Sequence, residues 1–281
     1  MKGTIRSAIT DLPQSFFDDV GQMLHHYSIG FYRIGGSGPD EDIILLGSGT
    51  LVKIDQIHAI LTAHHVVEIL PASGKLGVLT TLKIHRKTID TEGIKYLKIA
   101  RGTTDSEGPD IGAIVLPPSI AAALAAEKSF YNLTLHRDEL LKKPPERDIG
   151  VWFAHGFVDE MTIEEAGSEG FERLKNFCKF TGAGGPNEDP VTVKDHDYYL
   201  FPVTEARRAS SPKDYGGISG GGLWQIPIRK EPDGAVRPLA PLLSGVVFYQ
   251  QPVQQGTLAL KCHGRKSVYS VAYDAITRGQ P

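Results

Sequence analysis

The sequence predicts an all-β protein built from barrels or a sandwich. Short runs rich in Val, Ile, Leu, Thr and aromatic residues recur along most of the chain, as strands require. The 31 glycines and 18 prolines are spread between these runs, where they supply turns. Few helical patterns separate the runs, which argues against a parallel sheet of βαβ units.

The expected strands fall into two groups separated by a gap. The first group comprises 30–34, 42–46, 50–54, 58–61, 76–84, 96–100 and 111–116. The second group comprises 149–157, 198–203, 222–228, 242–250 and 266–273. Charged residues and a Pro-Pro pair make 138–147 a loop between the two groups, so two β halves of similar length are predicted.

Three segments carry helical patterns. Residues 12–26 place apolar side chains at helical spacing, and 119–128 is rich in alanine with Ser119 as a candidate N-cap. Residues 164–177 have mixed polarity and are the weakest of the three. The helix at 12–26 precedes the β region, and its expected role is packing on its own domain, with contact to a regulatory protein or a second copy as alternatives.

The composition is that of a soluble globular protein. The chain has 281 residues, 41% hydrophobic and 22% charged, with a net charge of −3. No basic run points to nucleic acid, and the apolar run at 120–126 is too short to span a bilayer. Two cysteines, Cys178 and Cys262, do not form a disulfide framework or a zinc motif. The N-terminus lacks a secretion signal, so a cytoplasmic protein is expected.

Three short motifs contain residues suited to nucleophilic catalysis. In the run YGGISGGGLW at 215–224, glycines free the backbone around Ser219, although a simple glycine turn is the plainer interpretation. His64 and His65 follow a strand-like run, where one imidazole can accept and return a proton. A structural histidine pair, or a metal site joining His65 and Glu68, are the alternatives. Asp110 is the first residue of an apolar strand, where a carboxylate needs a partner such as an imidazole. The alternative is that Asp110 caps the preceding turn.

Taken together, these motifs resemble the chymotrypsin-like serine peptidases, particularly the trypsin-like and HtrA-like branches. The resembling segments are GSGT at 47–50, TAHHV at 62–66, DIGAIVL at 110–116 and GISGG at 217–221. The resemblance covers about residues 30 to 275. It implies two six-stranded antiparallel β-barrels, with an N-terminal helix and short connecting helices. The chain would be one peptidase unit, 1–281, with a helical extension at 1–29, a first barrel at 30–135 and a second at 148–281.

The resemblance also implies the roles of individual residues. His65 would be the general base, Asp110 would orient it, and Ser219 would be the nucleophile that forms an acyl-enzyme. The backbone N–H groups of Gly217 and Ser219 would form the oxyanion hole, and no metal or cofactor is implied. The substrate is a polypeptide.

Peptide binding is expected along residues 244–250, which resemble the strand that pairs with the substrate backbone in this family. Phe248, Tyr249 and Gln250 would offer it backbone hydrogen bonds. Lys213 stands where trypsin-like members keep an acid, which would disfavour basic substrate side chains.

Two residues depart from the family pattern. His64 stands where the family has a small residue, and Ile218 replaces an acid or polar residue before the nucleophile. An isoleucine cannot pair with a new N-terminus, so activation by N-terminal cleavage is not expected. The acidic stretch around 159–169, within the long segment 156–197, is interpreted as a surface loop, with a cover over the cleft as the alternative.

Two other functions fit parts of the sequence. The motif at 217–221 also matches the nucleophile elbow of α/β-hydrolases, with Asp233 and His263 as later partners, but alternating helices are missing. A second alternative is an inactive or latent peptidase fold that serves as a peptide-binding module.

Overall fold

The protein is described by a computed structural model that covers residues 9–35, 42–80, 86–165, 174–177, 179–186, 188–203, 212–254 and 257–279. It is mostly β, with 45% of residues in strands. The expectation of a β protein is therefore confirmed in its coarse form, and of the two expected barrels one is closed. Cys178 lies outside the described residues.

The N-terminal half forms an antiparallel sheet. Its strands are β1 (Ser28–Gly35), β2 (Asp42–Ile54), β3 (Ile57–Thr62), β4 (Lys75–Leu79), β5 (Arg86–Asp90), β6 (Lys95–Arg101) and β7 (Asp110–Leu116). Their order is β5-β4-β1-β2-β3-β7-β6, and the short strand β8 (Tyr131–Asn132) joins β2 in parallel. The path from β5 to β6 is not closed by a further pairing within the described residues.

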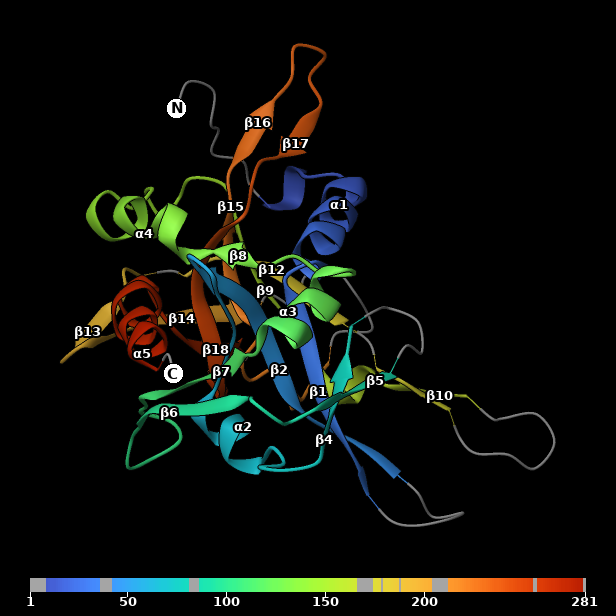
Figure 1. Ribbon diagram of the computed structural model, residues 1–281. Helices are drawn as coiled ribbons and strands as arrows, with labels where there is room; N and C mark the ends of the chain where they lie inside the picture. The colour runs from blue at the N-terminus through green and yellow to red at the C-terminus, as the bar shows by residue number, and fades with distance from the viewer. Residues whose placement is uncertain are drawn as a thin grey trace.

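The C-terminal half forms a closed six-stranded barrel. Its strands are β9 (Val151–Phe157), β12 (Lys179–Gly184), β14 (His196–Val203), β15 (Gly222–Ile226), β18 (Leu242–Gln254) and β19 (Thr257–His263). The pairing of Gly184 with Val203 closes it, and β13 (Val191–Val193) extends β14. Two hairpins project from this half: β10 (Ile163–Glu165) with β11 (Leu174–Asn176), and β16 (Ile228–Lys230) with β17 (Val236–Pro238). Figure 1 shows both.

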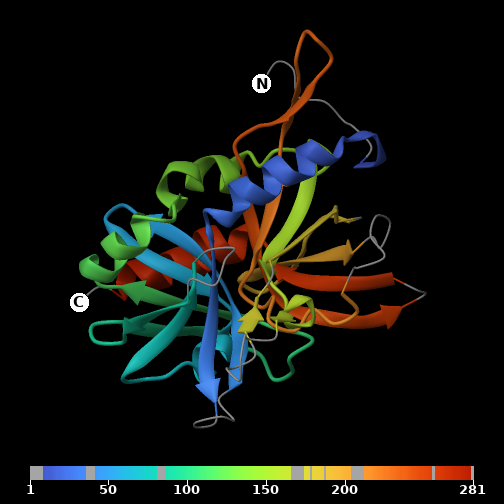
Figure 2. The ribbon, with the colours of Figure 1, turned by 90° about the vertical axis from the view of Figure 1, so that its right-hand side faces the viewer.

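The helices lie around the N-terminal sheet and the C-terminal barrel. They are α1 (Gln14–His25), α2 (His64–Ile69), α3 (Pro118–Ala125), α4 (Leu133–Lys142), α5 (Tyr273–Arg278) and the π-helical turn η4 (Ser267–Ala272), with 3-10 turns η1 (Ile9–Asp11) and η3 (Asp159–Met161). The spacing of Phe16, Val20 and Leu24 buries one face of α1. This helix packs against β1, β9 and β17, and Figure 2 shows it lying across both halves.

Several expected elements differ from the structure. The strand expected at 266–273 is helical, because Val268, Ala272 and Ile276 recur at helical spacing and are buried. The helix expected at 164–177 is also wrong, since β10 and β11 occupy its described ends. The loop expected at 138–147 begins inside α4, whose buried Leu133 and Leu140 hold it against the core.

One apolar core joins the two halves. Val52, Leu61 and Ile111 of the N-terminal sheet pack in the same buried cluster as Phe153 and Trp224 of the C-terminal barrel. Burial of this shared core fixes the ends of β3 and β7 relative to the loop before β15. The candidate catalytic residues lie at those places.

Candidate active site

His65 and Asp110 form a close pair. His65 lies in the first turn of α2, directly after β3, and Asp110 is the first residue of β7. The His65 ring Nδ1 is 2.6 Å from Asp110 Oδ2, and the His65 backbone N–H donates to Asp110 Oδ1 at 3.0 Å. Asp110 is buried, with 2% of its side chain exposed, whereas 35% of the His65 side chain is exposed. One side of the imidazole is thus anchored while the ring stays accessible.

The environment of Asp110 keeps it ionised. Burial alone would raise the pKa of Asp110, but the hydrogen bonds and charge of His65 and the charge of Arg101 outweigh burial and lower it. A permanently negative Asp110 holds a proton on His65 Nδ1, which leaves Nε2 to accept one.

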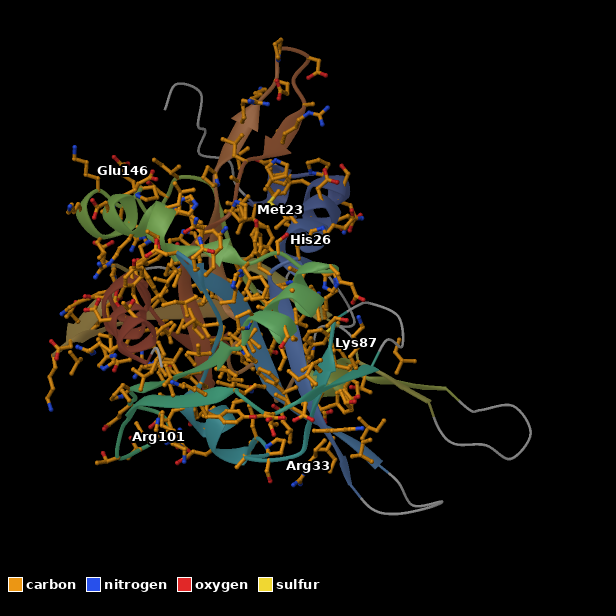
Figure 3. All side chains as sticks on the ribbon, in the orientation of Figure 1. Met23, His26, Arg33, Lys87, Arg101 and Glu146 are labelled. Atoms are coloured by element: carbon orange, nitrogen blue, oxygen red, sulfur yellow. The ribbon has the colours of Figure 1, made fainter. Side chains whose placement is uncertain are left out.

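Arg101 is a second partner of Asp110 that the sequence did not reveal. It lies on β6 directly opposite Asp110, and its guanidinium donates to Asp110 Oδ2 at 2.6 Å. The other side of the guanidinium binds Asp105, also at 2.6 Å. Figure 3 labels Arg101 at this end of the sheet. Only the register of β6 on β7 brings the two residues together, so no local sequence signal marks the pair.

His263 supports Asp110 from behind. The Asp110 backbone N–H donates to His263 Nε2 at 3.0 Å. Burial lowers the pKa of His263 to about 3, so its ring is neutral and accepts this bond. The ring also contacts the Phe248 ring in a tilted arrangement, with centroids 4.7 Å apart.

These contacts argue against the α/β-hydrolase alternative. That alternative pairs Asp233 with His263, but the Asp233 carboxylate caps the turn between β16 and β17 by accepting from Ala235 N–H. His263 serves Asp110 instead. The described sheets are antiparallel apart from the single β2–β8 pairing, whereas the hydrolase fold needs a parallel sheet.

The loop that carries Ser219 is held by glycines with positive φ. Gly217 has φ +89° and Gly220 has φ +93°, a region that favours glycine. A Cβ at Gly217 would overlap Leu45, and one at Gly220 would overlap the Ser48 carbonyl oxygen. The glycines expected from the sequence are therefore required by both conformation and space.

Ser48 ties this loop to the N-terminal sheet. Its backbone N–H donates to Ser219 O at 2.8 Å, and its hydroxyl donates to Gly217 O at 2.7 Å. The same hydroxyl accepts from the Phe157 backbone N–H at 2.8 Å. The conspicuous GSGT segment thus positions the loop, a role that its sequence alone does not specify.

The backbone around Ser219 leaves two donors available. The Gly216 carbonyl accepts from the Asp159 backbone N–H at 2.8 Å, which fixes the Gly216–Gly217 peptide. Neither the Gly217 N–H nor the Ser219 N–H is hydrogen-bonded to another described residue. Two such N–H groups beside a serine hydroxyl are what a tetrahedral oxyanion requires.

Ser219 and the helix that carries His65 meet at Gly47. A Cβ at Gly47 would lie 2.7 Å from Val66 on α2 and 3.3 Å from the Ser219 carbonyl oxygen. The Ser219 hydroxyl donates to Phe248 O at 3.3 Å. Within the described residues it makes no hydrogen bond to His65.

The expected substrate-binding residues lie beside the Ser219 loop. Phe248 is buried, whereas Tyr249 and Gln250 are half-buried on β18. The Gln250 side chain accepts from Tyr215 N–H at 2.7 Å and donates to Lys213 O at 3.3 Å. Lys213 itself is exposed, and its backbone N–H binds Glu160. Gln250 therefore bridges β18 and the 213–215 segment.

The contacts of His64 bear on the alternative of a metal site that joins His65 and Glu68. His64 is buried, and its Nε2 is 3.4 Å from Glu68 Oε1 one turn further along α2. Glu68 therefore pairs with His64 rather than with His65. Among the described residues no group of three or more His, Cys, Asp or Glu side chains is arranged to hold a metal ion.

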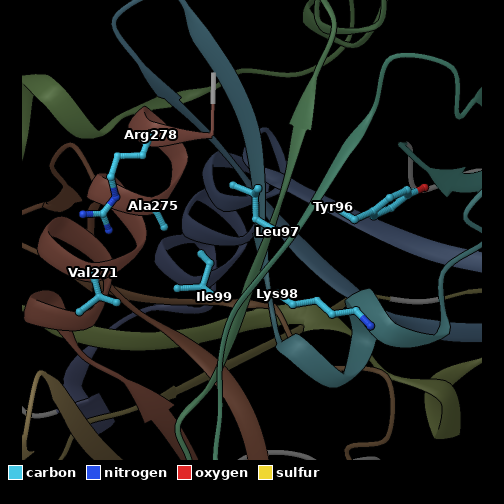
Figure 4. Close-up of a pocket in the computed structure, with 7 residues that line it drawn as sticks. All are labelled: Tyr96, Leu97, Lys98, Ile99, Val271, Ala275 and Arg278. Atoms are coloured by element: carbon cyan, nitrogen blue, oxygen red, sulfur yellow. The ribbon is translucent and has the colours of Figure 1, made fainter. Parts of the chain in front are cut away.

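A pocket lies apart from this site. It has a volume of about 430 Å³ and is formed by β6 opposite η4 and α5. Figure 4 shows Leu97 and Ile99 on the side of Val271, Ala275 and Arg278, whereas the side chains of Tyr96 and Lys98 extend to the other side of β6. None of these residues belongs to the candidate site.

Comparisons with known proteins support the fold. No protein-family model matches the chain, and no curated protein matches it in sequence. Among solved structures, an inactive form of Rv3671c from M. tuberculosis matches at a TM-score of 0.50 with 12% identity, covering 99% of both chains. The HtrA-type protease AlgW with a decapeptide matches at 0.46 with 11% identity, covering 94% of this chain and 68% of that one. The tobacco vein mottling virus protease matches at 0.39 with 10% identity, covering 94% and 82%.

The likeness to Rv3671c, at a TM-score of 0.50, supports a chymotrypsin-like fold. In the part of the chain that the structure describes, no helix is long and apolar enough to cross a membrane.

Proposed function

We propose that the chain is a serine endopeptidase, with Ser219 as nucleophile, His65 as general base and Asp110 as the group that orients His65. The observation that carries the proposal is the 2.6 Å contact between His65 Nδ1 and the buried Asp110 carboxylate, next to the Ser219 loop. In this proposal the N-terminal sheet, 30–135, acts as a first barrel and 148–281 as a second, with the site between them.

The reaction follows from this arrangement of groups. The Ser219 hydroxyl leaves its bond to Phe248 O, gives its proton to His65 Nε2, and forms a C–O bond with the scissile carbonyl carbon. The oxygen of that carbonyl takes the electron pair and is stabilised by the Gly217 and Ser219 N–H groups. The C–N bond then breaks, and His65 passes its proton to the leaving amine. Water repeats the sequence on the acyl-enzyme and restores Ser219.

β18 offers the substrate a free backbone edge. Its pairing with β15 ends at Val246, and Val247 N–H bonds to Gly221 O. Beyond that point, Tyr249 and Gln250 pair with Lys261 and Leu260 of β19 on one edge, and on the other edge β18 pairs with no described strand. An extended peptide that adds to this edge as a further strand would place its scissile carbonyl next to Ser219.

A latent or inactive peptide-binding form is the second candidate. It is favoured by the bond from the Ser219 hydroxyl to Phe248 O, because a serine held there is not hydrogen-bonded to its base. In this form, the serine would need a bound peptide to turn it toward His65.

A serine-reactive fluorophosphonate probe tests the proposal. The full chain is expected to be labelled, Ser219→Ala to lose all labelling, and Ser73→Ala, at an exposed loop position, to be labelled as the parent is. Labelling that survives in Ser219→Ala would overturn the assignment of the nucleophile. Absence of labelling with and without a peptide library would favour the inactive candidate.

A further inference from the structure

A cluster of basic side chains lies outside the candidate active site. It consists of His25 at the end of α1, Lys128 after α3, His155 on β9 and Lys179 on β12. The Lys128 ammonium donates to the His25 carbonyl at 2.9 Å and lies 3.2 and 3.3 Å from the two ring nitrogens of His25. His26, labelled in Figure 3, marks this end of α1.

The β9–β12 register places His155 and Lys179 together. Thr181 is directly opposite His155, and its hydroxyl is 2.7 Å from His155 Nδ1. Lys179, two residues before Thr181, is on the same face of β12 and is therefore a diagonal neighbour of His155. The four groups thus come from two strands, one helix end and one loop.

Two of the four side chains are buried and two are half-buried, with little negative charge near them among the described residues. Lys128 is 5% exposed and His155 is fully buried. Burial and, to a smaller extent, the charge of Lys179 lower the pKa of Lys128 to about 7, although the charge of Glu127 acts in the opposite direction. Burial also lowers the pKa of Lys179 to about 8. Glu127 is the one described acid that acts on any of the four groups, and it already binds Thr80 and Lys87.

His155 also has a polar atom with no partner. Its Nε2 is buried and makes no hydrogen bond within the described residues, because Thr181 engages only Nδ1. An unsatisfied buried polar atom costs about 1–3 kcal/mol. Lys179 likewise forms no ion pair with a described residue.

We propose that His25, Lys128, His155 and Lys179 form a binding site for a phosphate group. An anion between them would supply a counter-charge to the two lysines and a partner for His155 Nε2. Phosphate fits better than a carboxylate, because the donors come from several elements and phosphate offers acceptor oxygens in three dimensions. The proposal is independent of the peptidase chemistry, since none of these residues contacts Ser219, His65 or Asp110.

Calorimetric titration of the full-length Ser219→Ala variant tests the site. At pH 7 and constant ionic strength, inorganic phosphate is expected to bind saturably and to raise the melting temperature. Acetate is expected to bind at least about tenfold more weakly. O-phosphoserine distinguishes the source of the group: binding as tight as that of phosphate supports a phosphorylated ligand, and weaker binding supports free phosphate.

Variants locate the binding. Lys179→Met is expected to weaken phosphate binding by about 10- to 100-fold, as the loss of one charge-assisted hydrogen bond implies. Lys230→Met, at an exposed position on β16, is the matched control and should bind as the parent does. His155→Gln is also expected to weaken phosphate binding. If His155→Gln does not fold, Lys179→Met alone decides the test. No saturable binding of phosphate, equal binding of acetate, or unchanged binding in Lys179→Met would overturn the proposal.

Discussion

The two halves of the molecule hold their parts of the candidate site by different means. The N-terminal sheet fixes its residues with charge: buried Asp110 is bound by the His65 ring and by the Arg101 guanidinium. The C-terminal barrel fixes its residues with backbone: glycines at positive φ and the bond from Asp159 to Gly216 shape the Ser219 loop. A charged group can be neutralised with little change in shape, whereas a backbone conformation fails when one methyl group is added.

The largest effect on labelling and stability is expected from a substitution in the C-terminal half, where the backbone conformation shapes the Ser219 loop. Gly220→Ala places a Cβ on the Ser48 carbonyl oxygen at φ +93°, so the loop cannot keep its conformation. We expect loss of all probe labelling and a fall in the free energy of unfolding of about 4 kcal/mol or more, measured by urea denaturation.

Gly234→Ala is the matched control for this change. Gly234 has φ +87° in the turn between β16 and β17, and nothing lies within 4 Å of an added Cβ. Only the conformational cost of about 1–2 kcal/mol should remain, with full labelling. Equal loss of stability in both variants would show that space around Gly220 is not the constraint.

Substitutions in the N-terminal half, which holds its residues by charge, are expected to lower the catalytic rate rather than to unfold the protein. Asp110→Asn keeps the shape of the side chain but removes the charge that holds His65, so kcat/KM for a peptide substrate should fall by about 10⁴-fold. Asp105→Asn removes the exposed partner of the same Arg101 and should change the rate less than about twofold. An Asp110→Asn variant with a tenth of the parent activity would remove Asp110 from the proposed mechanism.

The same contrast explains what the sequence could predict. Ser219, His65 and Asp110 lie in short segments whose glycines, small residues and apolar strand are visible locally. Arg101 and the acceptor role of His263 depend on the β6–β7 register and on the contact of β19 with β7, which no local pattern encodes. The sequence predicts a strand at 266–273, where the structure has a helical turn, because the β-branched and aromatic residues there suit both structures. Tertiary packing of Tyr269 and Ala272 decides between them.

A change at Asp159 probes the backbone half without adding a side chain to the loop. Asp159→Pro removes the N–H that holds Gly216 O, and its position at the start of η3, after an extended Val158, tolerates proline. If the freed peptide turns the Gly217 N–H away, kcat should fall by about 10²- to 10³-fold with little change in KM. Asp159→Ala keeps the N–H and is expected to keep the parent kcat. Similar losses in both variants would assign the effect to the carboxylate instead.

The smallest effect concerns the buried His263 that joins the halves. Burial lowers its pKa to about 3 in the folded protein, whereas an unfolded histidine titrates near 6.5. Below about pH 6.5 the unfolded chain therefore binds a proton that the folded chain does not, and the free energy of unfolding falls by up to about 1.4 kcal/mol per pH unit until about pH 3. His25 and His155, whose pKa values burial also lowers, add to this slope. His263→Gln should remove part of the slope between pH 6 and 4.5 in urea denaturation, and an unchanged slope would mean that His263 is protonated in the folded state. A protonated ring could no longer accept from Asp110 N–H, so this outcome would also break the link between the charged half and the barrel.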